Sequence, residues 1–198
     1  MKVAFRLVVG MCLLALVGCA GNNYPPPGTV QEYDYIVGPG DNLEIFVWGN
    51  PELSTSATVR PDGKFTTRLV EDLRASGMTS TELAREIERA YGRYVKNPVV
   101  SVIVKGFVGV PTQQVRVVGE AAQPTNVPFR KHMTVLDLMI AVGGLNEFAN
   151  GNKSVLVRYT DGEQKVYNLR LEDLLEGDIA ANTPLMPGDI VIIPEAWF

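Results

Sequence analysis

Few residues of this 198-residue chain have the type and spacing that catalysis requires. His132 is the single histidine, so a metal site built from several imidazoles is excluded. No serine lies in a nucleophile-elbow pattern. The adjacent acids Glu71-Asp72 and Glu172-Asp173 could in principle serve glycoside hydrolysis, but neighbouring acids are more often solvated surface charges. The sequence therefore gives no support for an enzyme, a cofactor or a bound metal.

One cysteine, by contrast, stands in a specific chemical context. Lys2 and Arg6 precede an uncharged, almost wholly apolar run at residues 7–17, which is too short to span a bilayer and has the length of a signal-peptide core. The run ends in Leu16-Val17-Gly18-Cys19, which resembles a bacterial lipobox. The chemistry this implies is thioether attachment of diacylglycerol to Cys19, cleavage before it and acylation of the new amino group.

The lipobox interpretation predicts a signal peptide at residues 1–18 and a lipid attachment site at Cys19. The alternatives are an ordinary signal peptide with an accidental cysteine, or a weak membrane anchor. Cys12, the other cysteine, lies in the segment to be removed, so no disulfide is available to the mature protein. Two or three acyl chains anchor a protein stably where one does not, since each buried methylene contributes about 0.8 kcal/mol. Ala20 stands where an aspartate usually retains lipoproteins in the inner membrane, so we expect an outer-membrane location facing the periplasm.

The composition places the rest of the chain among globular proteins. Hydrophobic residues make up 46% and charged residues 20%, while 19 glycines and 13 prolines favour short strands and turns over a helical bundle. The net charge is −4 and no dense Lys/Arg cluster occurs, which argues against a nucleic-acid partner. Residues 19–32, which include Tyr24-Pro25-Pro26-Pro27-Gly28, are expected to form a lipidated, extended tether.

Two small α+β domains are expected after the tether. The first, at residues 33–105, begins with a strand at residues 43–47, where aliphatic residues alternate with others. Thr79 and Glu82 form a capping box that starts a helix. A strand rich in valine and isoleucine at residues 99–105 completes this domain.

A turn is predicted within the first domain at Arg60-Pro61-Asp62-Gly63, because its proline and glycine favour a tight reversal. The flanking residues 55–59 and 64–67 are predicted to pair as a hairpin around it.

The second domain is expected at residues 113–194. Thr134 with Asp137 caps its main helix, which Gly143-Gly144 ends through the left-handed conformation that glycine permits. Strands with one main helix between them indicate a β-grasp-like α+β topology. The other expected elements are strands at residues 113–119 and 189–193, a hairpin of residues 154–159 and 164–169 around Asp161-Gly162, and a short helix at residues 171–175.

A short repeat precedes a strand in each domain. Gly38-Pro39-Gly40-Asp41 precedes the strand at residues 43–47, and Met186-Pro187-Gly188-Asp189 precedes the final strand. Proline then glycine fits the central positions of a type II turn, and the aspartate can bond the following backbone. A phosphate-binding loop needs more glycines and a following helix, so a reused strand-entry turn is the favoured interpretation.

Several aromatic residues could stack on sugar rings. Core packing or subunit contact is the commoner role of such side chains, so none is nominated as a carbohydrate site. These residues are Trp48, Tyr91, Tyr94, Trp197 and Phe198.

A family resemblance rests on short segments taken in order. In the first domain they are Tyr35-Ile36-Val37-Gly38-Pro39-Gly40-Asp41, Val47-Trp48, Pro51-Glu52-Leu53-Ser54, Val59-Arg60-Pro61-Asp62-Gly63, residues 79–83 and residues 97–102. In the second they are Val117-Val118-Gly119-Glu120, residues 133–137, Ala141-Val142-Gly143-Gly144-Leu145 and Leu185-Met186-Pro187-Gly188-Asp189. The first set resembles the polysaccharide export domain of the Wza-type outer-membrane family. The second resembles the soluble-ligand-binding β-grasp (SLBB) domain that follows it in that family.

The resemblance implies a role in the export of exopolysaccharide or capsule. It implies a homo-oligomeric ring around a hydrophilic cavity, a polysaccharide co-polymerase in the inner membrane as partner, and passive conduction without cofactor or catalytic residue. Ring contacts would add burial that each small domain lacks alone. The substrate-binding residues stay unidentified.

Two features depart from the family pattern. The best-known members continue into a further β-grasp repeat and a C-terminal amphipathic helix, whereas Trp197-Phe198 follows directly on the last expected strand. We therefore expect a short form, a lipid-anchored periplasmic ring or adaptor beneath a separate outer-membrane barrel protein. Gln123-Pro124-Thr125 stands where members usually have Pro-Gly, which is expected to change a loop and not the function.

Two other functions stay open at this point. One is a small-ligand-binding envelope lipoprotein that uses its β-grasp domain, although the residues quoted above define turns and core more than a pocket. The other is a carbohydrate-active enzyme.

Overall fold

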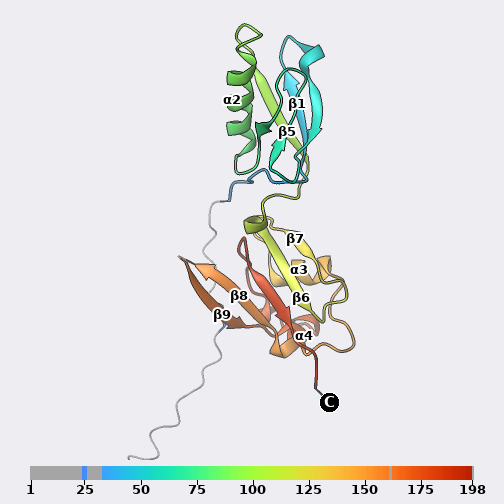
Figure 1. Cartoon of the computed structure of the whole chain (residues 1–198). Helices are drawn as coiled ribbons and strands as arrows, with labels where there is room; N and C mark the ends of the chain where they lie inside the picture. Colours follow the sequence, from blue (N-terminus) through green and yellow to red (C-terminus); the bar gives the residue numbers. More distant parts are fainter. Residues whose placement is uncertain (1–23, 26–32, 161, 198) are drawn as a thin grey trace, which may run out of the picture.

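The structure of the protein, a computed structural model, describes residues 24–25, 33–160 and 162–197. These residues form two units that each combine strands and helices (Figure 1). Residues 107–113 join the two units and are called the connecting segment below. The expected fold class, two small α+β domains, is confirmed.

The first unit contains a three-stranded antiparallel sheet in the order β2-β1-β5. Strand β1 (Asn42–Val47) lies in the centre, between β2 (Thr55–Thr58) and β5 (Val100–Gly106). Alternate residues of β1 are buried, as the sequence pattern predicted, because successive side chains of a strand point to opposite faces.

Helix α2 (Ser80–Tyr91) covers one face of this sheet. Its predicted capping box is present: the Thr79 amide donates to Glu82 at 2.8 Å, and the Glu82 amide donates to the Thr79 hydroxyl at 3.2 Å. The buried side chains of the helix join the core of the unit, which contains Leu43, Ile45, Phe65, Leu83, Ile87 and Tyr91.

The hairpin predicted from residues 55–59 and 64–67 is wrong, although its turn is correct. The Gly63 amide donates to the Arg60 carbonyl at 2.8 Å, as a tight turn requires. The two flanking strands, however, belong to different sheets: β2 pairs with β1, while β3 (Lys64–Phe65) pairs with β4 (Leu73–Arg74). The short 3-10 helix η2 (Pro51–Leu53) reverses the chain after β1, so that β2 pairs with β1. Strand β2 is therefore already paired before the chain reaches the turn at residues 60–63.

The second unit contains a five-stranded mixed sheet in the order β7-β6-β10-β8-β9. Its first and last strands, β6 and β10, lie side by side and parallel, and all other neighbours are antiparallel. This arrangement is β-grasp-like, as expected. The strands are β6 (Gln114–Gly119), β7 (Asn126–Pro128), β8 (Val155–Thr160), β9 (Glu163–Asn168) and β10 (Ile190–Ile193).

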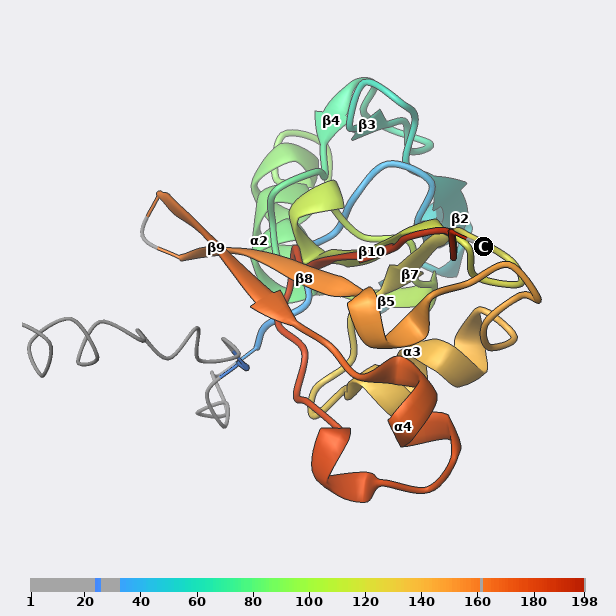
Figure 2. The ribbon, with the colours of Figure 1, turned by 90° about the horizontal axis from the view of Figure 1, so that it is seen from below.

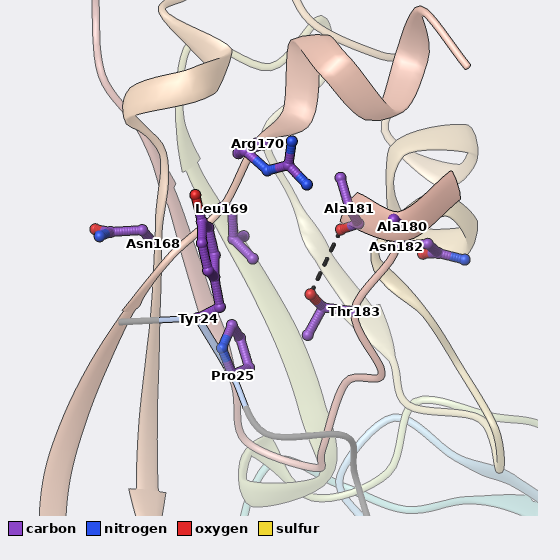
Figure 3. A pocket seen from close by; sticks show the side chains of 9 residues that line it. All are labelled: Tyr24, Pro25, Asn168, Leu169, Arg170, Ala180, Ala181, Asn182 and Thr183. Carbon is purple, nitrogen blue, oxygen red and sulfur yellow. Dashed lines mark hydrogen bonds between the residues drawn. The ribbon is translucent and has the colours of Figure 1, made fainter. Parts of the chain in front are cut away.

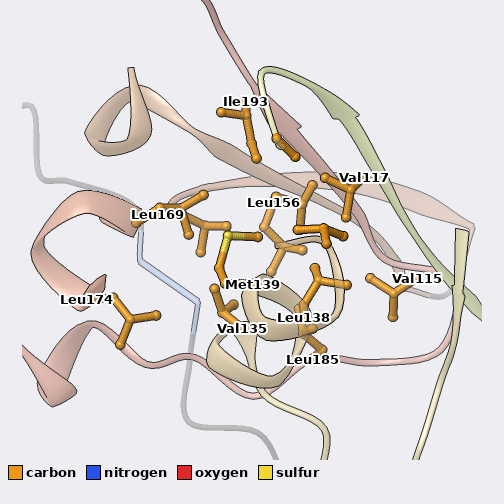
Figure 4. Packing of buried hydrophobic residues seen from close by; sticks show 14 of the residues in the cluster. Val115, Val117, Val135, Leu138, Met139, Leu156, Leu169, Leu174, Leu185 and Ile193 are labelled. Atoms are coloured by element: carbon orange, nitrogen blue, oxygen red, sulfur yellow. The ribbon is translucent and has the colours of Figure 1, made fainter. Parts of the chain in front are cut away.

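Helices α3 (Val135–Ala141) and α4 (Leu171–Leu175) contribute to one hydrophobic core against this sheet (Figures 2 and 4). Thr134 and Asp137 form the predicted capping box of α3, and Gly143 and Gly144 have positive φ angles of 78° and 85° where the helix ends. Full burial of a leucine contributes about 1.5–3 kcal/mol, so this core is the main stabilising feature of the unit. Its members include Val135, Leu138, Met139, Leu156, Leu169, Leu174, Val191 and Ile193. The remaining 3-10 helices are η3 (Pro111–Gln113), η4 (Gly151–Lys153) and η5 (Ile179–Ala181).

Gln113, at the end of the connecting segment, bonds the backbone at the start of the first unit. Its side-chain amide donates to the Asp34 carbonyl at 2.8 Å and accepts from the Ile36 amide at 2.9 Å. Tyr33 packs edge-to-face on Phe129 of the second unit, with ring centroids 5.1 Å apart. Two segments far apart in sequence are therefore held side by side between the units.

Candidate functional site

The predicted lipid attachment site, Cys19, lies outside the described residues, and so do the predicted signal peptide and most of the tether. Two residues of the tether, Tyr24 and Pro25, are described. They lie against the second unit, so the site can be built from the point where the tether contacts the fold.

Tyr24 stands between two hollows in the surface of the second unit. The first, which we call the tether groove, has a volume of about 290 Å³ (Figure 3). The second has a volume of about 280 Å³ and also involves Asn152, Lys153 and Asp173. The tether groove is lined by Tyr24, Pro25, Asn168, Leu169, Arg170, Ala180, Ala181, Asn182 and Thr183.

Arg170 is the charged group of the tether groove. Its guanidinium lies over the Tyr24 ring, 5.6 Å from the centroid, and pairs with Asp173 at 3.0 Å and Asp178 at 2.9 Å. Loss of hydration alone would lower the pKa of Arg170, but the charge of Asp178 and the hydrogen bonds to both aspartates outweigh it, so the pKa lies above its ordinary value. Arg170 is therefore a fixed cation positioned to hold an aromatic ring.

The first Pro-Gly-Asp turn places a buried carboxylate between the units. Gly40 has a φ of 92° and the Asp41 amide donates to the Gly38 carbonyl at 3.2 Å, as in a type II turn. Asp41 is fully buried and accepts hydrogen bonds from the amides of Gly38 at 2.9 Å, Val108 at 2.7 Å and Gly109 at 2.9 Å. Its carboxylate thus joins the turn to the connecting segment.

Tyr35 completes the environment of Asp41. Its hydroxyl donates to the carboxylate and lies 2.7 Å from each oxygen. Burial and then the hydrogen bond to Asp41 raise the pKa of Tyr35 well above its ordinary value, so the hydroxyl stays a donor.

The second Pro-Gly-Asp turn has the same backbone and a different partner. Gly188 has a φ of 85°, and the Asp189 amide donates to the Met186 carbonyl at 3.2 Å. The Asp189 carboxylate accepts from the Met186 amide at 2.7 Å and from Arg158 at 2.9 and 2.7 Å. Arg158 also donates to the Pro184 carbonyl at 3.1 Å. This is a bidentate ion pair between two buried side chains.

Sequence reasoning predicted both turns but not their chemistry. Each aspartate bonds the amide three residues before it, so the predicted bond to the following backbone is wrong. The ion pair was missed altogether. Its signal in the sequence is Arg158, a single cation within the largely apolar strand β8.

Three of the four acids considered in the adjacent acidic pairs have hydrogen-bond or ion-pair partners within the protein. Asp72 pairs with Arg60 at 2.6 Å on the surface. Glu172 accepts from the Gly151 amide at 2.7 Å, whereas Asp173 bonds Asn152 at 2.8 Å and pairs with Arg170. The carboxylates of Glu172 and Asp173 therefore engage separate partners.

His132 lies on the surface with a positive φ of 67°. Among residues 24–25, 33–160 and 162–197, no group of three or more His, Cys, Asp or Glu side chains could hold a metal ion.

The aromatic residues considered for sugar stacking are not gathered into one site. Tyr91 is buried in the first core, while Trp48 is 71%, Tyr94 63% and Trp197 98% exposed, and Phe198 lies outside the described residues. Trp48 lies near Phe46, with centroids 6.4 Å apart. Together with Val99 and Ile103, these two rings form an exposed apolar strip along β1 and β5, which we call the outer strip.

The fold defines a two-domain α+β protein whose second domain is β-grasp-like. The family description "Polysaccharide biosynthesis/export protein" matches residues 29–105, and "SLBB domain" matches residues 113–193. The chain thus contains a polysaccharide biosynthesis/export domain followed by an SLBB domain. The family matched by the first domain is one of export proteins and not of enzymes.

Two curated relatives share the name "EPS I polysaccharide export outer membrane protein EpsA". The protein from Ralstonia nicotianae is 30% identical over an alignment that covers 81% of this chain and 47% of the relative. The protein from Ralstonia solanacearum is 28% identical over an alignment that covers 79% of this chain and 47% of the relative. The chain thus spans about half the length of the curated relatives it matches.

In the part of the chain that the structure describes, no helix has both the length and the apolar character needed to cross a membrane.

Proposed function

We propose that this chain is a lipid-anchored component of a polysaccharide export machine at the outer membrane, facing the periplasm. The observation that carries the proposal is the order of the two domain matches, at residues 29–105 and 113–193, together with the export role that the names of the relatives state. The transported material would be exopolysaccharide or capsule, and the inner-membrane partner a polysaccharide co-polymerase.

Passive conduction is proposed over tight binding or catalysis. A hydrated polymer that must keep moving is served better by a wide polar passage, because tight sugar pockets would slow its exit.

The proposal includes a homo-oligomeric ring. The outer strip of Phe46, Trp48, Val99 and Ile103 exposes apolar area that a neighbouring subunit could bury. Mass measurement of the detergent-solubilised complex, with its native lipid, should give a multiple of the protomer mass. A strictly monomeric particle would contradict the ring. The double variant Trp48→Ser, Ile103→Ser should shift the complex toward monomer, whereas the exposed control Tyr94→Ser should not.

Genetic complementation tests the export role. Deletion of the gene should remove surface polysaccharide, and the intact gene should restore it. Cys19→Ser should leave the protein unlipidated and fail to restore export, whereas Cys12→Ser, the matched control within the predicted signal peptide, should restore it fully. A normal polysaccharide coat on the deletion strain would refute the proposal.

The predicted location has its own test. Mass spectrometry of the mature amino terminus should show a diacylglyceryl thioether and an acylated amine on Cys19. Ala20→Asp should move the lipoprotein from the outer-membrane to the inner-membrane fraction. An unmodified Cys19 thiol would remove the anchor from the proposal.

A second candidate, small-ligand binding by the second domain, is favoured by one observation: the tether groove gathers the polar residues Asn168, Arg170 and Asn182. Calorimetric titration with oligosaccharides distinguishes the two functions. Saturable, tight binding by a monomer would favour the ligand-binding role, and turnover of polymer by the purified protein would instead indicate a carbohydrate-active enzyme.

A further inference from the structure

The tether returns to the protein surface close to its proposed lipid. Tyr24 lies only five positions after Cys19, and its ring is held by Arg170 at 5.6 Å (Figure 3). Five extended residues span at most about 18 Å. A lipid on Cys19 therefore has to lie within that distance of the tether groove whenever Tyr24 is bound there.

A tip that exposes two large apolar side chains stands beside the tether groove. Helix α4 and the 3-10 helix η5 contact each other, and we call residues 171–181, which they span, the α4–η5 tip. Leu174 points into the core, whereas Leu175 is 45% and Ile179 65% exposed. Ile179 directly precedes Ala180 and Ala181, two residues that line the groove.

We propose that the contact between Tyr24 and Arg170 holds the α4–η5 tip against the lipid surface that carries the anchor, with Leu175 and Ile179 entering the headgroup region. The proposal rests on the lipid anchor of the proposed function. A bare lipid tether leaves a protein free to rotate. When Tyr24, five positions after the lipid attachment site, is also bound to the protein, only the face near Tyr24 can turn toward the membrane. Apolar side chains on that face then gain burial at the boundary of the bilayer.

The charge of the tip indicates which lipids it contacts. Glu172, Asp173, Glu176 and Asp178 carry four negative charges, and Arg170, which pairs with Asp173 and Asp178, supplies one positive charge against them. The remaining negative charge would be repelled by anionic headgroups. The partner surface is therefore a zwitterionic lipid surface, and the contact should weaken as anionic lipid is added.

Site-specific quenching tests the orientation on the complete mature lipoprotein. The protein is reconstituted in phosphatidylcholine vesicles that contain a lipid with a nitroxide headgroup. A fluorophore is attached at Ile179→Cys or, as control, at the exposed Tyr94→Cys in the first domain. The thiol of Cys19 is consumed by the thioether, so only the introduced cysteine reacts. The label at residue 179 should be quenched and the label at residue 94 should not; equal quenching would overturn the proposal.

A second variant tests the contact itself. Tyr24→Ala, combined with the label at residue 179, should lower the ratio of membrane-facing to free orientations about two- to fivefold, as expected for one exposed cation–π contact. Tyr94→Ala is the matched control and should change nothing. Unchanged quenching in Tyr24→Ala, with a melting curve like that of wild type, would contradict the role of Tyr24.

The remaining outcomes separate this inference from the proposed function. Protein that fails to float with vesicles and shows a bare Cys19 contradicts the anchor. Floating protein with equal quenching at both labels contradicts only the orientation. Quenching between labels on two neighbouring proteins, unlike quenching by the lipid, disappears when labelled protein is diluted with unlabelled protein. Such a loss would show that the tip contacts a second copy of the chain, and it would overturn the lipid contact.

Discussion

The two Pro-Gly-Asp turns share a backbone and differ in how they stabilise a buried carboxylate. Asp41 is surrounded by neutral donors: the Tyr35 hydroxyl and the amides of the turn and the connecting segment. Asp189 is paired with the Arg158 guanidinium. The turn sequence thus determines the turn and the bond to the amide three residues before, while the surrounding domain determines how the charge is compensated.

The hydrogen bonds to Asp41 and the ion pair of Asp189 stabilise different parts of the molecule. The donors of Val108 and Gly109 lie in the connecting segment, so the charge of Asp41 ties that segment to the first domain. Around Asp41 the backbones are so close that a β-carbon on Gly38 would lie 2.0 Å from the Gly109 carbonyl oxygen. Arg158 and Asp189 both belong to the second domain, so their pair stabilises that domain alone.

The largest difference between the turns should appear when the cation is removed. Arg158→Ala leaves Asp189 buried and unpaired, which should lower the free energy of unfolding by about 3–5 kcal/mol. Denaturant unfolding measures this, with Arg116→Ala on the exposed face of β6 as control, for which a change within about 0.5 kcal/mol is expected. A similar fall in the free energy of unfolding in both variants would show that removing the ion pair costs no more than removing an exposed arginine.

Neutralising Asp41 should have a smaller effect that reaches the connecting segment. An amide at this position presents one acceptor where the carboxylate has two, so at least one amide loses its partner and Asp41→Asn should cost about 1–3 kcal/mol. Hydrogen exchange should become faster at Gly38, or at Val108 and Gly109, according to which side the new amide nitrogen faces, whereas the exposed control Asp62→Asn should leave all three amides unchanged. Unaltered exchange at all three residues in Asp41→Asn would show that the carboxylate does not hold these amides.

Alanine at the turn glycines should reveal a still smaller difference. Gly40→Ala and Gly188→Ala each force a side chain into the left-handed region, at a cost of about 1–2 kcal/mol. The effect should be larger for Gly188, because its added carbon would lie 3.1 Å from the Thr112 carbonyl oxygen. At Gly40 the nearest atoms are 3.4 Å away, in the Val108 side chain, which can move. Thermal unfolding of the two variants compares them directly. Equal destabilisation would show that the strain of the positive φ sets the cost and that the contacts of the added carbon do not.

Local signals in the sequence predicted much of the fold. Both capping boxes, the two Pro-Gly-Asp turns and the hairpin of β8 and β9 depend on residues within a few positions of one another, and all are present. The failed prediction, the pairing of residues 55–59 with 64–67, depended on which of two partners a strand would take. That choice is made by the sheet and not by the turn.

The candidate site was less accessible to sequence reasoning for the same reason. Arg158 and Asp189 are 31 positions apart, and Asp41 and Val108 are 67 apart, so nothing local joins them. Tyr24 was assigned to an extended tether, and its contact with Arg170 depends on the folded second domain. Lipidation of Cys19 stays a prediction.

The capping boxes provide the smallest and most selective comparison between the domains. Hydrogen bonds from the Thr79 amide and then its hydroxyl lower the pKa of Glu82, and bonds from the Thr134 hydroxyl and then its amide lower that of Asp137. Because both folded pKa values are depressed, this stabilisation is present above the ordinary carboxyl pKa and is lost as the pH falls through the folded value.

Glu82→Gln and Asp137→Asn keep an acceptor for the capped amide but remove the charge, so each should flatten the acid side of the stability profile of its own domain. The effect should be greater for α3, because it has 7 residues against 12 in α2 and the cap supports a larger share of its backbone bonds. Thermal unfolding followed across the acid range measures both profiles. A steeper acid loss in either variant than in wild type would show that the cap carboxylates do not carry the linkage.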